Sequence, residues 1–196
     1  MLNVKEASEV IRFKLSKHRF KHSLQVAEVA RELAQHYQED ADKAYLIGLL
    51  HDYAKGISSE ELLAIAEKNN LLQDEMERQV PDLLHAPVGS WLVRHELKIE
   101  DGDILQAIRF HTLGDLNMNV MDKIIYLADM IEPGRDYPGQ ERLKCLAFRN
   151  LDDAMLFGLE STIRYCLDQG RLLHPRTIEV RNHYLQFMIR ERSPVR

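Results

Sequence analysis

Apolar residues recur at helical spacing along almost the whole chain. Residues 4–11 place apolar side chains three and four positions apart, and Asn3 with Glu6 precedes them as an expected helix cap. Ser58 with Glu61 forms a capping-box pattern before the segment LLAIAEK. No segment alternates with period two for long enough to predict a strand. The pattern therefore predicts an all-α fold.

The segment ADKAYLIGLLHDYAK, residues 41–55, is too apolar to be exposed on any broad face. Asp40 is its expected cap, and Gly56 is its expected C-terminal stop. We therefore predict one long buried helix that carries His51 and Asp52 near its end.

Helix signals continue through the second half of the chain. Pro87 fits the first turn of the helix APVGSWLVRHEL, which leaves His85 at its approach. Asp101 is expected to cap GDILQAIRFHT, and Asn119 is expected to cap VMDKIIYLADMI. The chain is thus expected to continue as separate helices joined by short connections.

The segment EPGRDYPGQ, residues 132–140, is rich in Pro and Gly and predicts a loop. About three more helices follow, for which Asn150 and Thr177 are expected caps and Gly170 an expected stop. We found no linker or repeat, so we expect a single domain over residues 1–196. Its architecture is expected to be an orthogonal helical bundle rather than a simple up-down one.

Composition excludes several classes of partner. Lys and Arg number 26 against 31 Asp and Glu, giving a formal charge of −5, so no field attracts nucleic acid. The amino terminus lacks a signal-like apolar segment, and no run of about 18 apolar residues predicts a membrane span. Cys145 and Cys166 lack CxxC spacing and are expected to be reduced. These features favour a cytoplasmic protein.

Metal-binding residue types occur within or beside the apolar segments, at His22, His51, Asp52, His85, His111 and Asp129. Asp129 lies in YLADMI, where an unpaired charge costs several kcal/mol, so it requires a metal or an Arg. His111 shares a helix face with Ile104, Ala107 and Ile108 and is expected to point inward. Taken alone, His51 fits a core histidine better than a ligand, and spacing does not assemble the six residues into one site. The remaining histidines lack an inward-pointing context, although His18 lies one turn before His22; the others are His36, His95, His174 and His183.

Imidazole and carboxylate donors without thiolate suit iron, manganese, cobalt, nickel or zinc, and they disfavour a structural zinc site. Asp52 adjoins another candidate ligand and offers two oxygens, so it is suited to bridge two cations. Two cations about 3.5–4 Å apart can generate a bound hydroxide and orient a phosphoryl group, which indicates phosphoester or phosphoanhydride hydrolysis. Lys55, one turn after Asp52, and Arg135, in the loop after Asp129, could hold phosphate oxygens, although such residues are more often surface charges.

The ordered ligand set resembles that of the HD-domain superfamily of metal-dependent phosphohydrolases, in the variant with two extra histidines. The strings HSLQVAE, LHDYAKG, HAPVGSWL, AIRFHTLG and IIYLADMIEPGRDYPG are similar to the bacterial YqeK-type family of symmetrical diadenosine tetraphosphate hydrolases. The likeness spans roughly residues 18 to 185. It implies an HD core over about 18–133 and a C-terminal helical extension over 138–196.

The resemblance implies a di-iron site in which Asp52 bridges the two ions. One ion would be held by His22, His51, Asp52 and Asp129, and the second by Asp52, His85 and His111. It also implies that Asp52, Lys55 and Arg135 act in catalysis. The residues implied to meet the phosphates of the nucleotide are His18, Lys55, Arg109, Thr112 and Arg135.

The implied reaction is attack of a metal-bound hydroxide on diadenosine tetraphosphate at its central anhydride, giving two ADP, with ADP or GDP as product-like ligands. Tyr137 could stack on a base, or it could be an ordinary loop residue. The C-terminal helices could cap the site or pair with a second copy as a homodimer. Two alternatives stay open: another HD phosphohydrolase acting on a nucleoside monophosphate, an alarmone or a cyclic dinucleotide, and a metal-containing nucleotide-binding regulator.

Overall fold

The structure is a computed structural model that describes residues 4–192 and the side chains of residues 4–190. Asn3, the expected cap of the first helix, lies outside the described residues. The helices are α1 (Val4–Lys14), α2 (Lys17–His36), α3 (Ala41–Leu50), α4 (Ser59–Lys68), α5 (Met76–Gln79), the 3-10 helix η1 (Pro81–Leu84), α6 (His85–Leu97), α7 (Gly102–Phe110), α8 (Val120–Ile131), α9 (Gln140–Ala147), α10 (Leu151–Asp168) and α11 (Pro175–Arg192). No strand occurs among residues 4–192, which confirms the all-α prediction.

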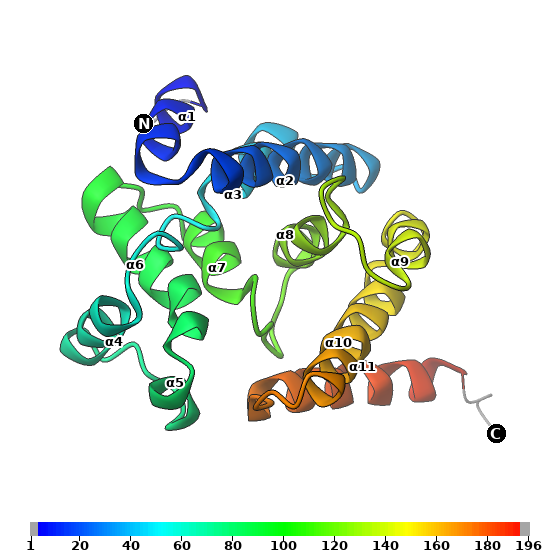
Figure 1. The fold of residues 1–196 in the computed structure, drawn as a ribbon. Helices are drawn as coiled ribbons and strands as arrows, with labels where there is room; N and C mark the ends of the chain where they lie inside the picture. Colours follow the sequence, from blue (N-terminus) through cyan, green and yellow to red (C-terminus); the bar gives the residue numbers. More distant parts are fainter. Residues whose placement is uncertain (1–3, 193–196) are drawn as a thin grey trace.

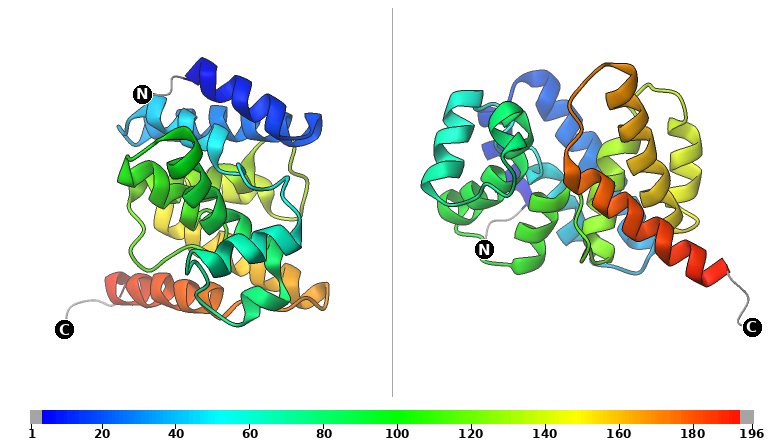
Figure 2. Two further views of the ribbon diagram at one scale, coloured as in Figure 1. Left: turned by 90° about the vertical axis from the view of Figure 1, so that its left-hand side faces the viewer. Right: turned by 90° about the horizontal axis from the view of Figure 1, so that it is seen from below.

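The helices cross one another at steep angles, as predicted for an orthogonal bundle (Figure 1). Helices α2, α3, α7 and α8 pack together and supply much of the buried core. On one side lie α4 to α6, and on the other α9 to α11, with α11 packed on α10 and running out toward the C-terminus (Figure 2). No helix within residues 4–192 is long and apolar enough to cross a membrane.

Side-chain caps fix where several of the helices begin. The Asp40 carboxylate accepts from the first backbone N–H groups of α3, and Ser58 and Asp101 do the same for α4 and α7. Asn119 forms a complete capping box at the start of α8, and Asn150 caps α10. These five predicted caps are confirmed, because each depends only on residues two or three positions away.

The prediction of one helix over residues 41–55 is wrong, because α3 ends at Leu50 and residues 51–56 form successive turns. His51 Nδ1 lies 2.7 Å from the carbonyl oxygen of Gly48, the acceptor that the N–H of Asp52 would need to continue the helix. Beyond it, backbone bonds span three residues, as from Tyr53 N–H to the Leu50 carbonyl. These tight turns, rather than an α-helix, determine where the side chains of Asp52 and Lys55 lie.

Two expectations near the C-terminus are also wrong. Helix α11 begins at Pro175, so Thr177 lies inside it rather than capping it. His174, which was not expected to point inward, is buried 3.6 Å from the buried carboxylate of Glu77. Gly170, with φ +59°, ends α10 as predicted.

A close approach of α2 and α3 brings the first candidate ligands together. A Cβ on Gly48 would lie 2.6 Å from Cα of Ala27, so only glycine allows this helix spacing. The rings of His22 on α2 and His51 after α3 are consequently 5.2 Å apart between centroids. The packing of two apolar helices thus sets the distance between two candidate ligands.

Candidate metal centre

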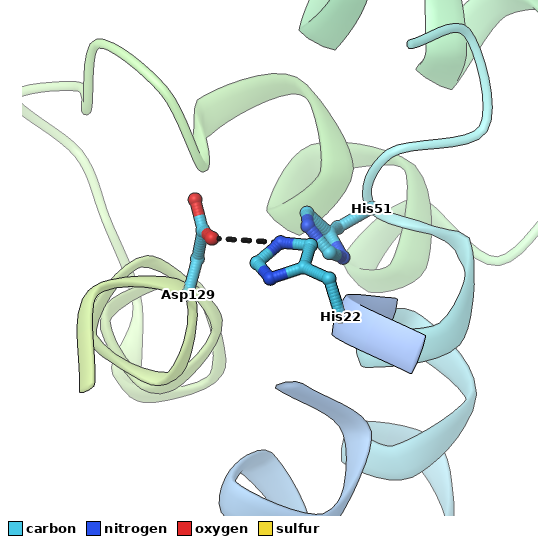
Figure 3. Close-up of side chains that lie close together, drawn as sticks. All are labelled: His22, His51 and Asp129. Atoms are coloured by element: carbon cyan, nitrogen blue, oxygen red, sulfur yellow. Dashed lines mark ion pairs between the residues drawn. The ribbon is translucent and has the colours of Figure 1, made fainter. Parts of the chain in front are cut away.

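The structure brings the six candidate ligands into one cluster at the meeting point of α2, α6, α7, α8 and the turn after α3. Figure 3 shows His22, His51 and Asp129 projecting toward one another from three separate segments. His22 Nε2 lies 3.1 Å from Asp129 Oδ1. The donor atoms of these three residues all lie within 4.8 Å of one another, as do those of His51, Asp52 and His111.

Asp52 faces imidazoles of both groups, and its Oδ1 lies 3.7 Å from Nε2 of His51, which belongs to each of them. Its Oδ1 is 3.5 Å from Nε2 of His85 and 3.8 Å from Nε2 of His111. Its Oδ2 is 3.9 Å from Nε2 of His22. This arrangement matches what a carboxylate needs in order to contact two cations at once.

Three of the imidazoles are oriented by their own helical turns. Nδ1 of His51 and of His111 each lies 2.7 Å from the carbonyl three residues earlier. Nδ1 of His85 lies beside the Asp82 carbonyl in the same way. An Nδ1–H that donates to a carbonyl leaves the Nε2 lone pair facing the cluster, which is the usual arrangement of metal-ligating histidines.

The polar atoms of the cluster fit a cation. His51 Nε2 is buried and has no hydrogen-bond partner within the described part of the chain. The Nε2 atoms of His85 and His111 lie 3.1 Å apart, so two lone pairs would face each other without a proton or a metal between them. Together with the two carboxylates, this donor set suits a divalent metal of the borderline type.

Four of the pKa shifts favour metal-binding protonation states. His22 differs, because although burial lowers its pKa, the hydrogen bond and the charge of Asp129 raise that pKa above the usual value. Burial lowers the pKa of His51 to about 4, and burial with the neighbouring His111 and Lys55 lowers that of His85 to about 3. Although burial raises the pKa of both carboxyls, nearby imidazoles hold Asp52 and Asp129 well below their usual range. These four groups therefore carry free lone pairs near neutral pH.

Two residues that sequence reasoning missed contact the cluster. Glu132 is buried, and its Oε1 lies 3.2 Å from Nδ1 of His22, so it orients that imidazole. Arg19 Nη1 lies 3.6 Å from Oδ2 of Asp52. The sequence held a signal for each: Glu132 follows Asp129 within one turn, and Arg19 precedes His22 by three positions on the same helix face.

Replacing Glu132 with alanine is expected to weaken metal binding by about 10- to 100-fold, because His22 would lose the acceptor that orients it. Replacing it with glutamine keeps a carbonyl acceptor for Nδ1–H and is expected to lose much less. Metal affinity, measured by competition with a chelator of known affinity, tests the pair. Glu141→Gln, at an exposed position on α9, serves as the control. Equal affinity for wild type and Glu132→Ala would remove Glu132 from the site.

The cluster opens into a cavity of about 530 Å³, here called the metal cavity. Four of the predicted phosphate contacts line it: His18, Lys55, Thr112 and Arg135. Lys55 Nζ lies 2.9 Å from Asp82 Oδ2 and 3.1 Å from His85 Nδ1, and Thr112 Oγ1 lies 3.1 Å from His85 Nε2. Arg135 pairs with the Asp129 carboxylate and donates from Nε to its backbone carbonyl at 2.9 Å.

The other two predicted contacts lie elsewhere. Arg109 is exposed and lines a separate cavity of about 20 Å³ together with Gln73 and Arg176. Tyr137 lines a larger cavity that adjoins the metal cavity, and its hydroxyl donates to the Met130 carbonyl at 3.0 Å. The structure therefore does not bring Arg109 to the cluster. Tyr137 lines the adjoining cavity rather than the metal cavity.

Comparisons with known proteins agree with this geometry. A protein of Halalkalibacterium halodurans named symmetrical bis(5'-nucleosyl)-tetraphosphatase is 39% identical over 94% of this chain and 98% of its own. One of the same name from Bacillus subtilis is 35% identical over 90% of this chain and 94% of its own. A crystal structure from Clostridium acetobutylicum, described as a predicted HD superfamily hydrolase involved in NAD metabolism, superposes with a TM-score of 0.91 at 37% identity, covering 95% of this chain and 99% of that one. Residues 19–134 match the HD domain family, and the chain belongs to that family.

Proposed function

We propose that this protein hydrolyses diadenosine tetraphosphate at its central anhydride and releases two ADP. The prediction of an HD-domain hydrolase is confirmed by relatives that carry the tetraphosphatase name over nearly their full lengths. The structural observation that carries the proposal is Asp52, placed between four imidazoles at the base of a cavity edged by cationic side chains.

We infer that two metal ions would be held here, one by His22, His51, Asp52 and Asp129 and the other by Asp52, His85 and His111. The ion is proposed to be iron from the family resemblance, and the same donors suit manganese, cobalt, nickel or zinc. When bound, the ions would supply a nucleophile at neutral pH and polarise the phosphoryl group. Glu132 and the helical carbonyls keep the imidazoles in the orientation that this requires.

The chain's own cations are proposed to hold the substrate phosphates. Arg19 and Arg135 each pair with a carboxylate of the cluster, Asp52 and Asp129 respectively. With a metal bound, the carboxylate would share its charge, so the arginine partner would be held less strongly and could bind a phosphate oxygen. Lys55 lies beside His85 and can take the charge that develops on a leaving phosphate.

Replacing Arg135 with alanine is expected to raise KM for the dinucleotide by about 10- to 100-fold with a smaller effect on kcat, because a charge-assisted hydrogen bond contributes about 1.5–3 kcal/mol. Steady-state kinetics on metal-replete protein measures the two constants. Arg149→Ala, which removes an exposed arginine after α9, is the matched control. Unchanged kinetics in Arg135→Ala would exclude this residue from the substrate site.

The function is tested by incubating metal-replete protein with diadenosine tetraphosphate and separating the nucleotides by anion exchange. ADP as the sole product supports central cleavage, whereas ATP plus AMP would mean cleavage of another bond. The absence of product would contradict the proposal and favour another phosphorylated substrate or a binding role. NAD, which also joins two nucleosides through a phosphoanhydride, should be assayed in parallel, because the crystal structure from Clostridium acetobutylicum is described in terms of NAD metabolism.

A further inference from the structure

A second cavity, here called the α10 cavity, lies between the loop after α8 and helix α10 and has a volume of about 720 Å³. Both cavities fall in the size range of small-molecule sites. They adjoin each other, because four residues line both: Met130, Gly134, Arg135 and Thr162. A ligand that fills both must be elongated and must pass Arg135.

The two cavities differ in charge. The metal cavity is edged by Arg19, Lys21, Lys55 and Arg135, which suits a polyphosphate. It also holds the carboxylates of the cluster, but Asp52 and Asp129 are the proposed metal ligands and Glu132 contacts His22, so their charge is directed to the metal site. Beyond Arg135, the α10 cavity adds one arginine and three carboxylates, together with three aromatic rings. The added residues are Arg164; Asp136, Glu160 and Asp168; and Tyr137, Phe157 and Tyr165. Carboxylates repel a phosphate but can accept from ribose hydroxyls and an exocyclic amine, and aromatic rings stack on bases.

Of the three rings, Tyr165 is the most accessible for stacking. Phe157 and Tyr137 are only partly exposed, and the hydroxyl of Tyr137 is bonded to a backbone carbonyl. Tyr165 is 50% exposed, with Arg171 at 5.1 Å from its centroid. It lies about one helical turn from Thr162, which faces both cavities.

We propose that the α10 cavity is a nucleoside subsite, in which Tyr165 stacks on one base of the dinucleoside polyphosphate and Arg135 holds the phosphate at the junction. This inference rests on the proposed function for the identity of the complete substrate. It assigns base binding chiefly to α10 rather than to the loop residue Tyr137. Helix α10 follows the segment that matches the HD domain, so part of the substrate site would lie outside that segment.

The test is Tyr165→Ala, made in the full chain and assayed with its metal bound. Loss of base stacking is expected to raise KM for diadenosine tetraphosphate and the calorimetric Kd for ADP by roughly 5- to 150-fold, with kcat largely kept. Tyr165→Phe keeps the ring and should retain wild-type affinity. Leu167→Ala is the matched control, because Leu167 is exposed on the same helix and lies outside the residues lining the cavity.

Inorganic tripolyphosphate separates base binding from phosphate binding, because it carries no base. Its inhibition constant should be the same for wild type and Tyr165→Ala, and a parallel rise would overturn the subsite. Unchanged KM and ADP affinity in Tyr165→Ala would also overturn it, while central cleavage by the wild type could stand. If the wild type fails to cleave diadenosine tetraphosphate but ADP binding still depends on the ring at position 165, the nucleoside subsite stands and the proposed function fails.

Discussion

Replacing Asp52 with alanine is expected to abolish hydrolysis and to lower the metal content of the protein at the same time. Asp52 contacts both halves of the cluster, with Oδ1 toward His85 and His111 and Oδ2 toward His22. Metal ions contribute several kcal/mol of charge stabilisation in such reactions, so kcat/KM should fall by at least about 10³-fold. Metal analysis of the purified variant and product chromatography measure the two effects on one sample.

The conservative variant Asp52→Asn tests whether charge or shape matters, because it keeps the volume of the side chain. It should lose activity almost as completely, since a neutral amide is a poor bridge between cations. Asp42→Asn, at an exposed position in the first turn of α3, controls for the loss of one carboxylate. Full activity in Asp52→Ala would refute the bridging assignment, and loss of activity with normal metal content would point to a role in substrate binding.

Replacing Gly48 with alanine is expected to destabilise the fold and to disrupt the cluster from outside it. The added Cβ would meet backbone atoms of α2, at 2.6 Å from Cα and 2.9 Å from N of Ala27, and backbone cannot rotate away. Overpacking of this kind costs about 3 kcal/mol, and the better helix propensity of alanine returns at most about 1 kcal/mol. The net loss of about 2 kcal/mol corresponds to a fall in Tm of roughly 4–8 °C for a domain of this size.

The change should also separate His22 from His51, so metal affinity should fall together with Tm although no ligand is altered. Thermal unfolding and chelator competition on the same preparation measure both. Gly102→Ala is the matched control, because no atom lies within 4 Å of its would-be Cβ, and it should leave Tm unchanged or slightly higher. A normal Tm in Gly48→Ala would show that the two helices can move apart without cost.

The features predicted well from sequence are those whose causes are local. The caps at Asp40 and Asn119 bond to N–H groups within the next three residues, so the sequence around them is sufficient. The end of α3 was missed because it depends on a side-chain bond, from His51 to the Gly48 carbonyl, that a hydrophobic pattern does not encode. Thr177 was misplaced because Pro175 can itself begin a helix.

In the candidate site, too, features with local causes could be predicted and features that depend on distant contacts could not. Asp129 and His111 could be selected because charged or imidazole groups within apolar segments need partners, whereas the complete set of six followed from the resemblance to the HD-domain superfamily. Glu132 was missed because its partner His22 lies 110 positions away in the chain, and its position within one turn of Asp129 does not by itself identify that partner. Arg109 has the composition of a phosphate contact, yet its position on α7 turns it toward solvent. Long-range partners and side-chain direction required the folded structure.

The bonds from the imidazoles of His51, His85 and His111 to carbonyls three residues earlier bear on when the metal is acquired. These bonds are completed within single turns and need no cation, and the helices around them bury an extensive apolar core. The apoprotein is therefore expected to fold first, unlike small zinc domains that are unfolded without their ion. Metal binding would then follow folding. We therefore expect that one metal ion can replace another in the folded protein when the cellular supply of metals changes.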